Sequence, residues 1–190
     1  MFDHLIHELG SALENNQRII PSFKNALAKA RVTMASNFEA GVSTDLLIKA
    51  NSDFMDDIMR LAWNRFKWTE NRTSWRKSRI SLLAVGGYGR QELLPNSDID
   101  LLILLERNNQ SAHRDNIQSF TTLLWDIGLE VGHSVRSIAE CKPSALHDVT
   151  ILTAMMESRT ILGDGALYDK VQQKIAPGRS WSAKSFYLAK

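Results

Sequence analysis

The stretch of sequence that decides the fold runs from Leu83 to Leu102 and reads LAVGGYGRQELLPNSDIDLL. An apolar run leads into it and stops at a pair of glycines, which is the pattern of a buried strand that ends in a turn. A Pro-Asn pair marks a second turn, and a run rich in leucine and isoleucine follows it. The predicted elements are a strand over Ile80–Val85, a single helical turn over Tyr88–Leu94, a turn at Pro95-Asn96 and a strand over Asp98–Leu105.

Two carboxylates stand at the start of the second predicted strand. Side chains alternate along a strand, so Asp98 and Asp100 point to the same face, with their Cα atoms about 7 Å apart. Both can converge on divalent cations, and two such ions stabilise the entering and leaving oxygens of a phosphoryl displacement. Mg²⁺ suits the pair because it takes one or two protein carboxylates together with phosphate oxygens and water. We predict Asp98 and Asp100 as the catalytic, metal-binding residues, with Mg²⁺ as cofactor and Mn²⁺ as the alternative.

Four further residues of the same stretch predict nucleotide binding. Gly86 and Gly87 have no side chains, so their backbone amides can approach a phosphate closely. The Ser97 hydroxyl can donate to a phosphate oxygen, although it can also cap the turn. Arg90 can pair with a triphosphate or form a structural ion pair with Glu92. The combination on strand, helical turn and strand favours a nucleotide site at Gly86, Gly87, Arg90 and Ser97.

Further elements are predicted on both sides. Residues 1–20 form a short helix or a loose arm, and helices follow over Pro21–Phe38 and from Thr44. Apolar spacing downstream predicts helices over Ser111–Asp126, Ile138–His147, Asp148–Glu157 (with a strand as the alternative) and Ala166–Ile175, and strands over Leu129–Val135 and Arg159–Leu162.

These elements predict an α/β (α+β) fold with a small mixed sheet of three to five strands, in which Ile80–Val85, Ile99–Leu105 and Leu129–Val135 are neighbours. We divide the chain into an N-terminal helical segment (1–70), an α/β domain (71–176) and the start of a following helical region (177–190), as in a fragment of a longer protein. The cations Arg72, Arg76, Lys77 and Arg79 are interpreted as a solvated linker.

Composition excludes several classes of protein. Hydrophobic residues make up 44% of the 190 residues, too many for a disordered chain, and a net charge of +2 argues against a polybasic nucleic-acid binder. Cys141 is the only cysteine, so no disulfide framework can form within the chain, and we interpret it as a buried apolar residue. No signal peptide begins the sequence and its apolar runs are too short to cross a bilayer. We therefore expect a cytoplasmic protein without nucleic-acid or membrane partners.

The motif resembles a known family. Gly86 to Arg90 and Ser97 to Leu102 resemble the signature of the polymerase β-like nucleotidyltransferases. The match is closer to the branch of bifunctional uridylyltransferase/uridylyl-removing enzymes, through Val131 to Arg136 and Glu157-Ser158-Arg159. The resemblance covers roughly Ser81 to Asp164, whereas residues 1–70 match only in being helical.

The resemblance implies transfer of UMP from UTP to a tyrosine of the nitrogen regulator PII, with release of pyrophosphate. Asp98 and Asp100 would match the metal-binding pair, and Gly86, Gly87 and Ser97 the triphosphate-binding residues. The superfamily usually adds a third carboxylate as general base on a later strand, and both Glu130 and Glu140 remain open for that role here. His133 is interpreted as structural, and His147-Asp148 as a chance resemblance to the hydrolase motif of the longer enzymes. The alternatives are another acceptor, or a regulatory domain that binds a nucleotide without turnover.

The metal pair gives a first prediction. Asp98→Asn or Asp100→Asn should abolish transfer and leave the fold intact, because each substitution removes a charge at a solvent-facing strand end and little packing. Pyrophosphate release and the circular dichroism spectrum would be measured side by side in an active form of the enzyme. Turnover near the wild-type rate in either variant would show that the site is assigned wrongly.

Overall fold

A computed structural model describes residues 1–15, 18–68, 79–108, 110–176, Trp181, Lys184 and Leu188. The chain falls into two compact units that interleave in sequence. The first unit comprises Met1–Phe66, Gln91–Ile99 and Asn116–Val131, and the second comprises Lys67–Arg90, Asp100–Asp115 and Gly132–Lys190.

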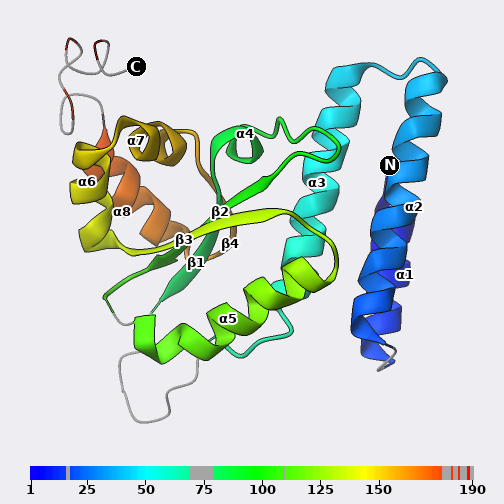
Figure 1. The fold of residues 1–190 in the computed structure, drawn as a ribbon, viewed down its shortest axis with the longest axis horizontal. Helices are drawn as coiled ribbons and strands as arrows, with labels where there is room; N and C mark the ends of the chain where they lie inside the picture. Colours follow the sequence, from blue (N-terminus) through cyan, green and yellow to red (C-terminus); the bar gives the residue numbers. More distant parts are fainter. Residues whose placement is uncertain are drawn as a thin grey trace. The chain divides into compact units, whose positions relative to one another are not determined.

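Three helices build most of the first unit: α1 (Asp3–Glu14), α2 (Ile19–Glu39) and α3 (Thr44–Trp63), which pack pairwise against one another (Figure 1). Leucines at positions 5, 9 and 13 bury one face of α1, the spacing expected of an amphipathic helix. The rings of Phe2 and Phe54 lie 4.9 Å apart between centroids. The predicted helical segment is therefore confirmed, and its first residues form a helix rather than a loose arm.

The first unit also contains the later turns of α5 (Gln110–Asp126). Phe120 on this helix meets Trp63 of α3 edge-on, with ring centroids 5.1 Å apart. Gly128, with φ +89°, then ends the helix. Leu129 N–H donates to Leu124 O and Gly128 N–H donates to Trp125 O, the two bonds of a Schellman cap.

A four-stranded sheet lies at the centre of the second unit: β1 (Ile80–Ala84), β2 (Ile99–Leu105), β3 (Val131–Ser137) and β4 (Arg159–Gly163), in the order β3-β2-β1-β4. β1 is antiparallel to both β2 and β4. Ile99 N–H donates to Glu130 O before β2 and β3, and the Asn108 amide donates to the Glu140 carboxylate beyond them, so these two strands run in the same direction. The predicted mixed sheet and the predicted neighbours are confirmed.

Helices α6 (Ile138–His147), α7 (Val149–Met156) and α8 (Gly165–Ile175) gather on one side of the sheet (Figure 1). Their apolar faces share a core with Leu83 of β1 and with Leu102 and Leu104 of β2. Cys141 is fully buried in this core, and burial raises the pKa of its thiol to about 11. This environment confirms the interpretation of Cys141 as a buried apolar residue.

Two predicted boundaries are wrong by a few residues. The helical turn predicted over Tyr88–Leu94 is instead α4 (Gly86–Gly89), which begins directly after β1. It cannot continue because Gln91 has φ +61°, and Leu93 makes its backbone hydrogen bonds with side chains of α3 instead. The third strand starts at Val131 rather than Leu129, because the cap of α5 uses Gly128 and Leu129.

Arg79 is not the solvated linker cation that the sequence suggested. Its guanidinium donates to Glu106 at 2.6 Å and to Asp164 at 2.8 Å. These hydrogen bonds raise the pKa of Arg79 and lower the pKa values of both carboxyls. The other cations of the predicted linker, Arg72, Arg76 and Lys77, lie outside the described residues.

The region predicted to begin a further helix, 177–190, lies outside the described residues except at three positions. One of these, Trp181, donates its indole N–H to Ala145 O at 2.7 Å. Within the ranges that the structure describes, none of the helices has the length and apolar character needed to cross a membrane.

The Arg79 ion pairs predict a pH dependence of stability. Both carboxyls have folded-state pKa values below their ordinary values of 4.5 for Glu106 and 3.8 for Asp164. The stability they contribute is therefore complete above those ordinary values and is lost as the pH falls through the lower folded values. Arg79→Gln should lower the free energy of unfolding at pH 7 and make it less sensitive to acid between about pH 5 and pH 2.

Urea unfolding at a series of pH values would measure this effect. Lys29→Gln is the control, because Lys29 pairs with Glu8 on the exposed surface, where ion pairs contribute little. The same pH profile in Arg79→Gln and the wild type would contradict the assigned role of Arg79.

Candidate functional site

The two predicted metal-binding carboxylates lie at the start of β2. Asp98 immediately precedes the strand, Asp100 is its second residue, and both are exposed as predicted. The backbone here is held at successive residues: Ile99 N–H donates to Glu130 O at 2.8 Å, and Val85 N–H donates to Asp100 O at 3.1 Å. The carboxylates therefore project from a backbone that neighbouring segments fix in place.

The carboxylate of Asp100 is flanked by glycines on two other elements. A Cβ atom built on Gly132 of β3 would lie 2.7 Å from Asp100 Oδ1, closer than real Cβ contacts allow. A Cβ atom on Gly86 of α4 would lie 3.7 Å from Asp100 Oδ2, an ordinary contact distance. The structure therefore brings both glycines beside the Asp100 carboxylate, and a side chain at position 132 would require that carboxylate to shift. Glycine inside a strand often marks such a close approach, a signal that the sequence reasoning overlooked.

The other predicted site residues divide between the two units. Gly86, Gly87, Arg90 and Asp100 belong to the second unit. Ser97 belongs to the first, where it is exposed and its N–H donates to Leu94 O at 3.2 Å. Asp98, the next residue, is also in the first unit.

Glu157, before β4, and Arg159, its first residue, contact the short helix α4 and the residue that follows it. Arg90 Nη1 lies 2.5 Å from Glu157 Oε2. The Arg159 guanidinium lies over the ring of buried Tyr88, 5.1 Å from its centroid, and donates to Tyr88 O. Glu157 and Arg159 thus position the helix that carries the glycine pair. No periodic signal in the sequence identified them, although both lie in a stretch that carried the family resemblance.

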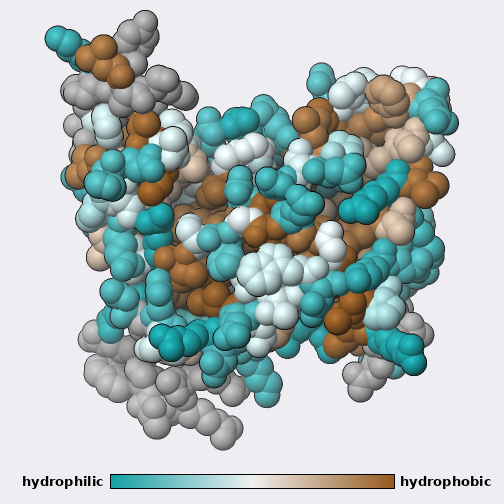
Figure 2. Space-filling view, in the orientation of Figure 1, coloured by the Kyte–Doolittle hydropathy of each residue, from teal (hydrophilic) through white to brown (hydrophobic). Residues whose placement is uncertain are grey.

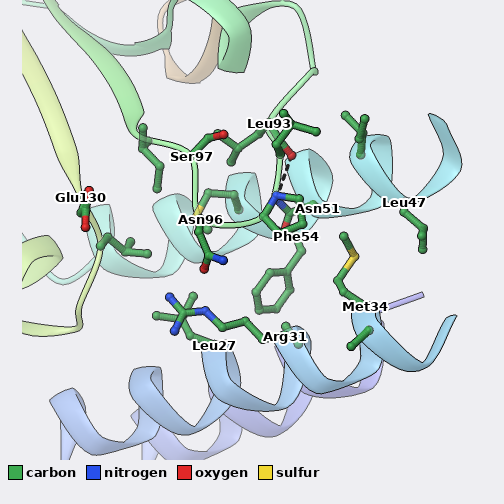
Figure 3. Close-up of a pocket in the computed structure, with 18 of the residues that line it drawn as sticks. Leu27, Arg31, Met34, Leu47, Asn51, Phe54, Leu93, Asn96, Ser97 and Glu130 are labelled. Atoms are coloured by element: carbon green, nitrogen blue, oxygen red, sulfur yellow. Dashed lines mark hydrogen bonds between the residues drawn. The ribbon is translucent and has the colours of Figure 1, made fainter. Parts of the chain in front are cut away.

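Helix α3 holds the loop that contains Ser97. The Asn51 side-chain amide donates to Leu93 O at 2.9 Å (Figure 3). Leu93 N–H donates to the Ser52 hydroxyl at 3.2 Å. Ser52 is fully buried. No local pattern predicts that these residues pair, because they are separated by about forty positions along the chain.

Several other polar residues near the motif have structural roles. Glu140 completes a capping box at the start of α6, where its carboxylate accepts from the Ser137 N–H at 2.8 Å and the Ser137 hydroxyl at 2.7 Å. These bonds lower the pKa of Glu140. Asp148 caps α7 by accepting from Thr150 N–H, which accounts for the acid of the His147-Asp148 pair. His133 is exposed on β3.

The donor set suits a hard cation of the Mg²⁺ class. Two carboxylates at one strand end, with glycine backbone beside Asp100, leave room for an ion that takes its remaining ligands from phosphate and water. No cluster of three or more His, Cys, Asp or Glu side chains that could hold a metal occurs among the residues that the structure covers. Asp98 and Asp100 as metal ligands remain a prediction, in which phosphate and water would supply the other ligands.

Comparison with known proteins places this geometry in a family. The chain is 48% identical over 171 residues to a bifunctional uridylyltransferase/uridylyl-removing enzyme of Azotobacter vinelandii. It is 47% identical to the enzyme of that name from Ectopseudomonas mendocina and 46% identical to the one from Pseudomonas fluorescens. Each match covers 90% of this chain and 18% of the relative, so the chain spans less than a fifth of the length of these proteins.

A family match covers the motif itself. Residues 67–157 match the nucleotidyltransferase domain, and this range includes β1, α4, β2 and β3 with both carboxylates. The match and the identities agree with the fold that the sequence predicted. Residues 67–157 of this chain are therefore similar to the nucleotidyltransferase domain family, and they contain the predicted site.

Proposed function

We propose that this domain transfers UMP from UTP to a tyrosine hydroxyl of the nitrogen regulatory protein PII, and that it requires Mg²⁺. The observation that carries the proposal is the position of the Asp100 carboxylate between Gly86 and Gly132, two residues after Asp98. The name uridylyltransferase borne by the similar proteins supports UTP as the donor. The protein acceptor follows from the resemblance of the motif to the PII-modifying branch.

Each part of the motif would have its own task. Asp98 and Asp100 would hold Mg²⁺, which neutralises charge on the phosphates when it is bound. The backbone amides of Gly86 and Gly87 would bind phosphate oxygens, and the Ser97 hydroxyl would donate to another. Arg90 already has a partner in Glu157 and would reach the nucleotide as a member of that ion pair.

The transfer also needs a group that accepts the tyrosine proton. As the tyrosine oxygen bonds to the α-phosphorus, the bond from that phosphorus to the bridging oxygen breaks and pyrophosphate leaves. Of the two acids left open by the sequence, Glu140 is held by the α6 capping box. Glu130 is exposed, and its carbonyl is bonded to the N–H of Ile99, the residue between the two aspartates. We therefore propose that the Glu130 carboxylate accepts the proton of the tyrosine hydroxyl.

Mg²⁺-dependent release of pyrophosphate from each of the four nucleoside triphosphates, with and without PII, would test the proposal. Release from UTP alone, dependent on PII, is the expected result for an active enzyme containing this domain. Release that depends on a different acceptor would replace PII, and nucleotide binding without release would favour the regulatory alternative.

A further prediction concerns the 190-residue chain by itself. Its nucleotide-binding groups are present, but a protein acceptor commonly docks over about 800 Å² per partner. We expect the chain to bind UTP with Mg²⁺ weakly and to transfer UMP poorly or not at all. Calorimetric titration of UTP with and without Mg²⁺ would measure binding, and a PII-labelling assay would measure transfer. Absence of Mg²⁺-dependent binding would contradict the first part, and labelling at the rate of the long enzymes would contradict the second.

Gly132 provides a test of the site geometry. Gly132→Ala should weaken Mg²⁺-dependent UTP binding by about 10- to 100-fold, the usual effect of disturbing a group that orients a metal ligand. The reason is that the new methyl group would displace the Asp100 carboxylate. Gly10→Ala in α1 is the control, because a Cβ atom there meets nothing within 4 Å. Equal UTP affinity in both variants would show that UTP binding does not depend on the position of the Asp100 carboxylate beside Gly132.

A further inference from the structure

The first unit contains a pocket of about 500 Å³. Its walls come from α2, α3, the loop that holds Ser97 and the turn after α5 (Figure 3). This volume lies within the range of pockets that bind small molecules or single side chains. Most of the residues that line this pocket have no part in the metal and phosphate binding proposed above.

The pocket has an apolar end and a polar end. Figure 3 shows Met34 and Leu47 at one end, with the ring of Phe54 between the ends. The Arg31 guanidinium and the carboxylate of Glu130 lie toward the other end. Neither of these two charged side chains forms an ion pair with another residue in the ranges that the structure covers. An occupant with an apolar body and a polar tip would match this division.

Large apolar side chains remain exposed at the rim. Phe38 and Leu94 both line the pocket and are 64% and 50% exposed. Figure 2 shows hydrophobic side chains at the surface in the region of α2 and α3. Apolar rims of this kind favour contact with another protein rather than with a free, highly charged nucleotide.

The polar end of the pocket includes one residue of the motif. Ser97 lines the pocket, and the next residue along the chain is Asp98. Glu130 lines it as well, and its carbonyl accepts from the N–H of Ile99. A hydroxyl at this end would therefore meet Ser97 and Glu130, which both belong to the first unit.

We propose that this pocket receives the side chain of the acceptor tyrosine. The ring would pack against Met34, Leu47 and Phe54, and the hydroxyl would point to Ser97 and Glu130. A tyrosine has the required apolar body and polar tip, whereas a uracil base carries polar groups around most of its edge and would leave them unpaired against apolar walls. Seating the ring would supply the positioning that in-line attack requires. The inference rests on the proposed function and names the place where its acceptor binds.

Methyl NMR of the 190-residue chain, labelled with ¹³C at the methionine methyl groups, would test the proposal. Met34 and Met55 line the pocket, and Met155 lies in the core of the second unit as an internal reference. Titration with N-acetyltyrosinamide should shift the Met34 and Met55 signals through the ring current, with half-saturation on the order of 1 mM, and leave Met155 unchanged. Uridine should leave all three unchanged.

A pair of tryptophan variants provides the matched control. Ala35 and Ala28 are both exposed on α2, and only Ala35 lines the pocket. Ala35→Trp should fill the pocket and abolish the tyrosine-induced shift at Met55, whereas Ala28→Trp should retain it.

The outcomes separate this inference from the proposed function. Absence of shifts at Met34 and Met55, or equal shifts with uridine, would overturn the tyrosine pocket even if the chain binds UTP. Shifts that persist in Ala35→Trp would overturn it too. If the wild-type chain showed no Mg²⁺-dependent binding of UTP, that result would instead contradict the proposed function.

Discussion

The close packing around the Asp100 carboxylate constrains the rest of the site. One carboxylate oxygen lies where a side chain on Gly132 would be, and the other faces Gly86. This arrangement requires β2 to lie between β1, which leads into Gly86, and β3, which contains Gly132. The adjacent strands β3, β2 and β1 thus bring the two glycines to the Asp100 carboxylate, where neither adds a side chain of its own. A hard cation bound there, as proposed, would take most of its ligands from phosphate and water.

The carboxylates in this chain fall into two groups by their hydrogen bonds. Glu140, Asp148 and Asp164 accept from backbone N–H groups at the starts of α6, α7 and α8, which satisfies donors that helices leave without partners. The pKa of Glu140 is lowered chiefly by its bond from the Ser137 N–H, that of Asp148 chiefly by the Thr150 hydroxyl, and that of Asp164 chiefly by Arg79. Asp98 and Glu130, in contrast, are exposed. The hydrogen bonds therefore identify Glu140, Asp148 and Asp164 as acids that hold the fold, which residue type alone does not.

The sequence predicted β1 and β2 well because they are short apolar runs, whose ends are marked by the glycine pair and by Pro95-Asn96. It also predicted that Asp98 and Asp100 would lie near solvent at a strand end, as they do. It placed α4 wrongly because the backbone of Leu93 bonds to α3, a contact between distant parts of the chain that no local pattern reports. Arg79 was misread for the same reason, since its partners are 27 and 85 residues away. The roles of the site residues themselves remain predictions, because they depend on ligands as well as on the fold.

The N-terminal helices include α3, which is hydrogen-bonded to the loop that contains Ser97. In the sequence they resembled the family only in being helical, yet the similarity to the uridylyltransferases covers 90% of the chain and so extends well beyond residues 67–157. The structure offers a physical reason: Asn51 and Ser52 of α3 bond both backbone groups of Leu93, four residues before Ser97. These bonds hold the loop that contains Ser97, so the phosphate contact proposed for this serine would depend on α3 as well as on the motif. A change in α3 that breaks these bonds would therefore act on Ser97 without altering any residue of the motif.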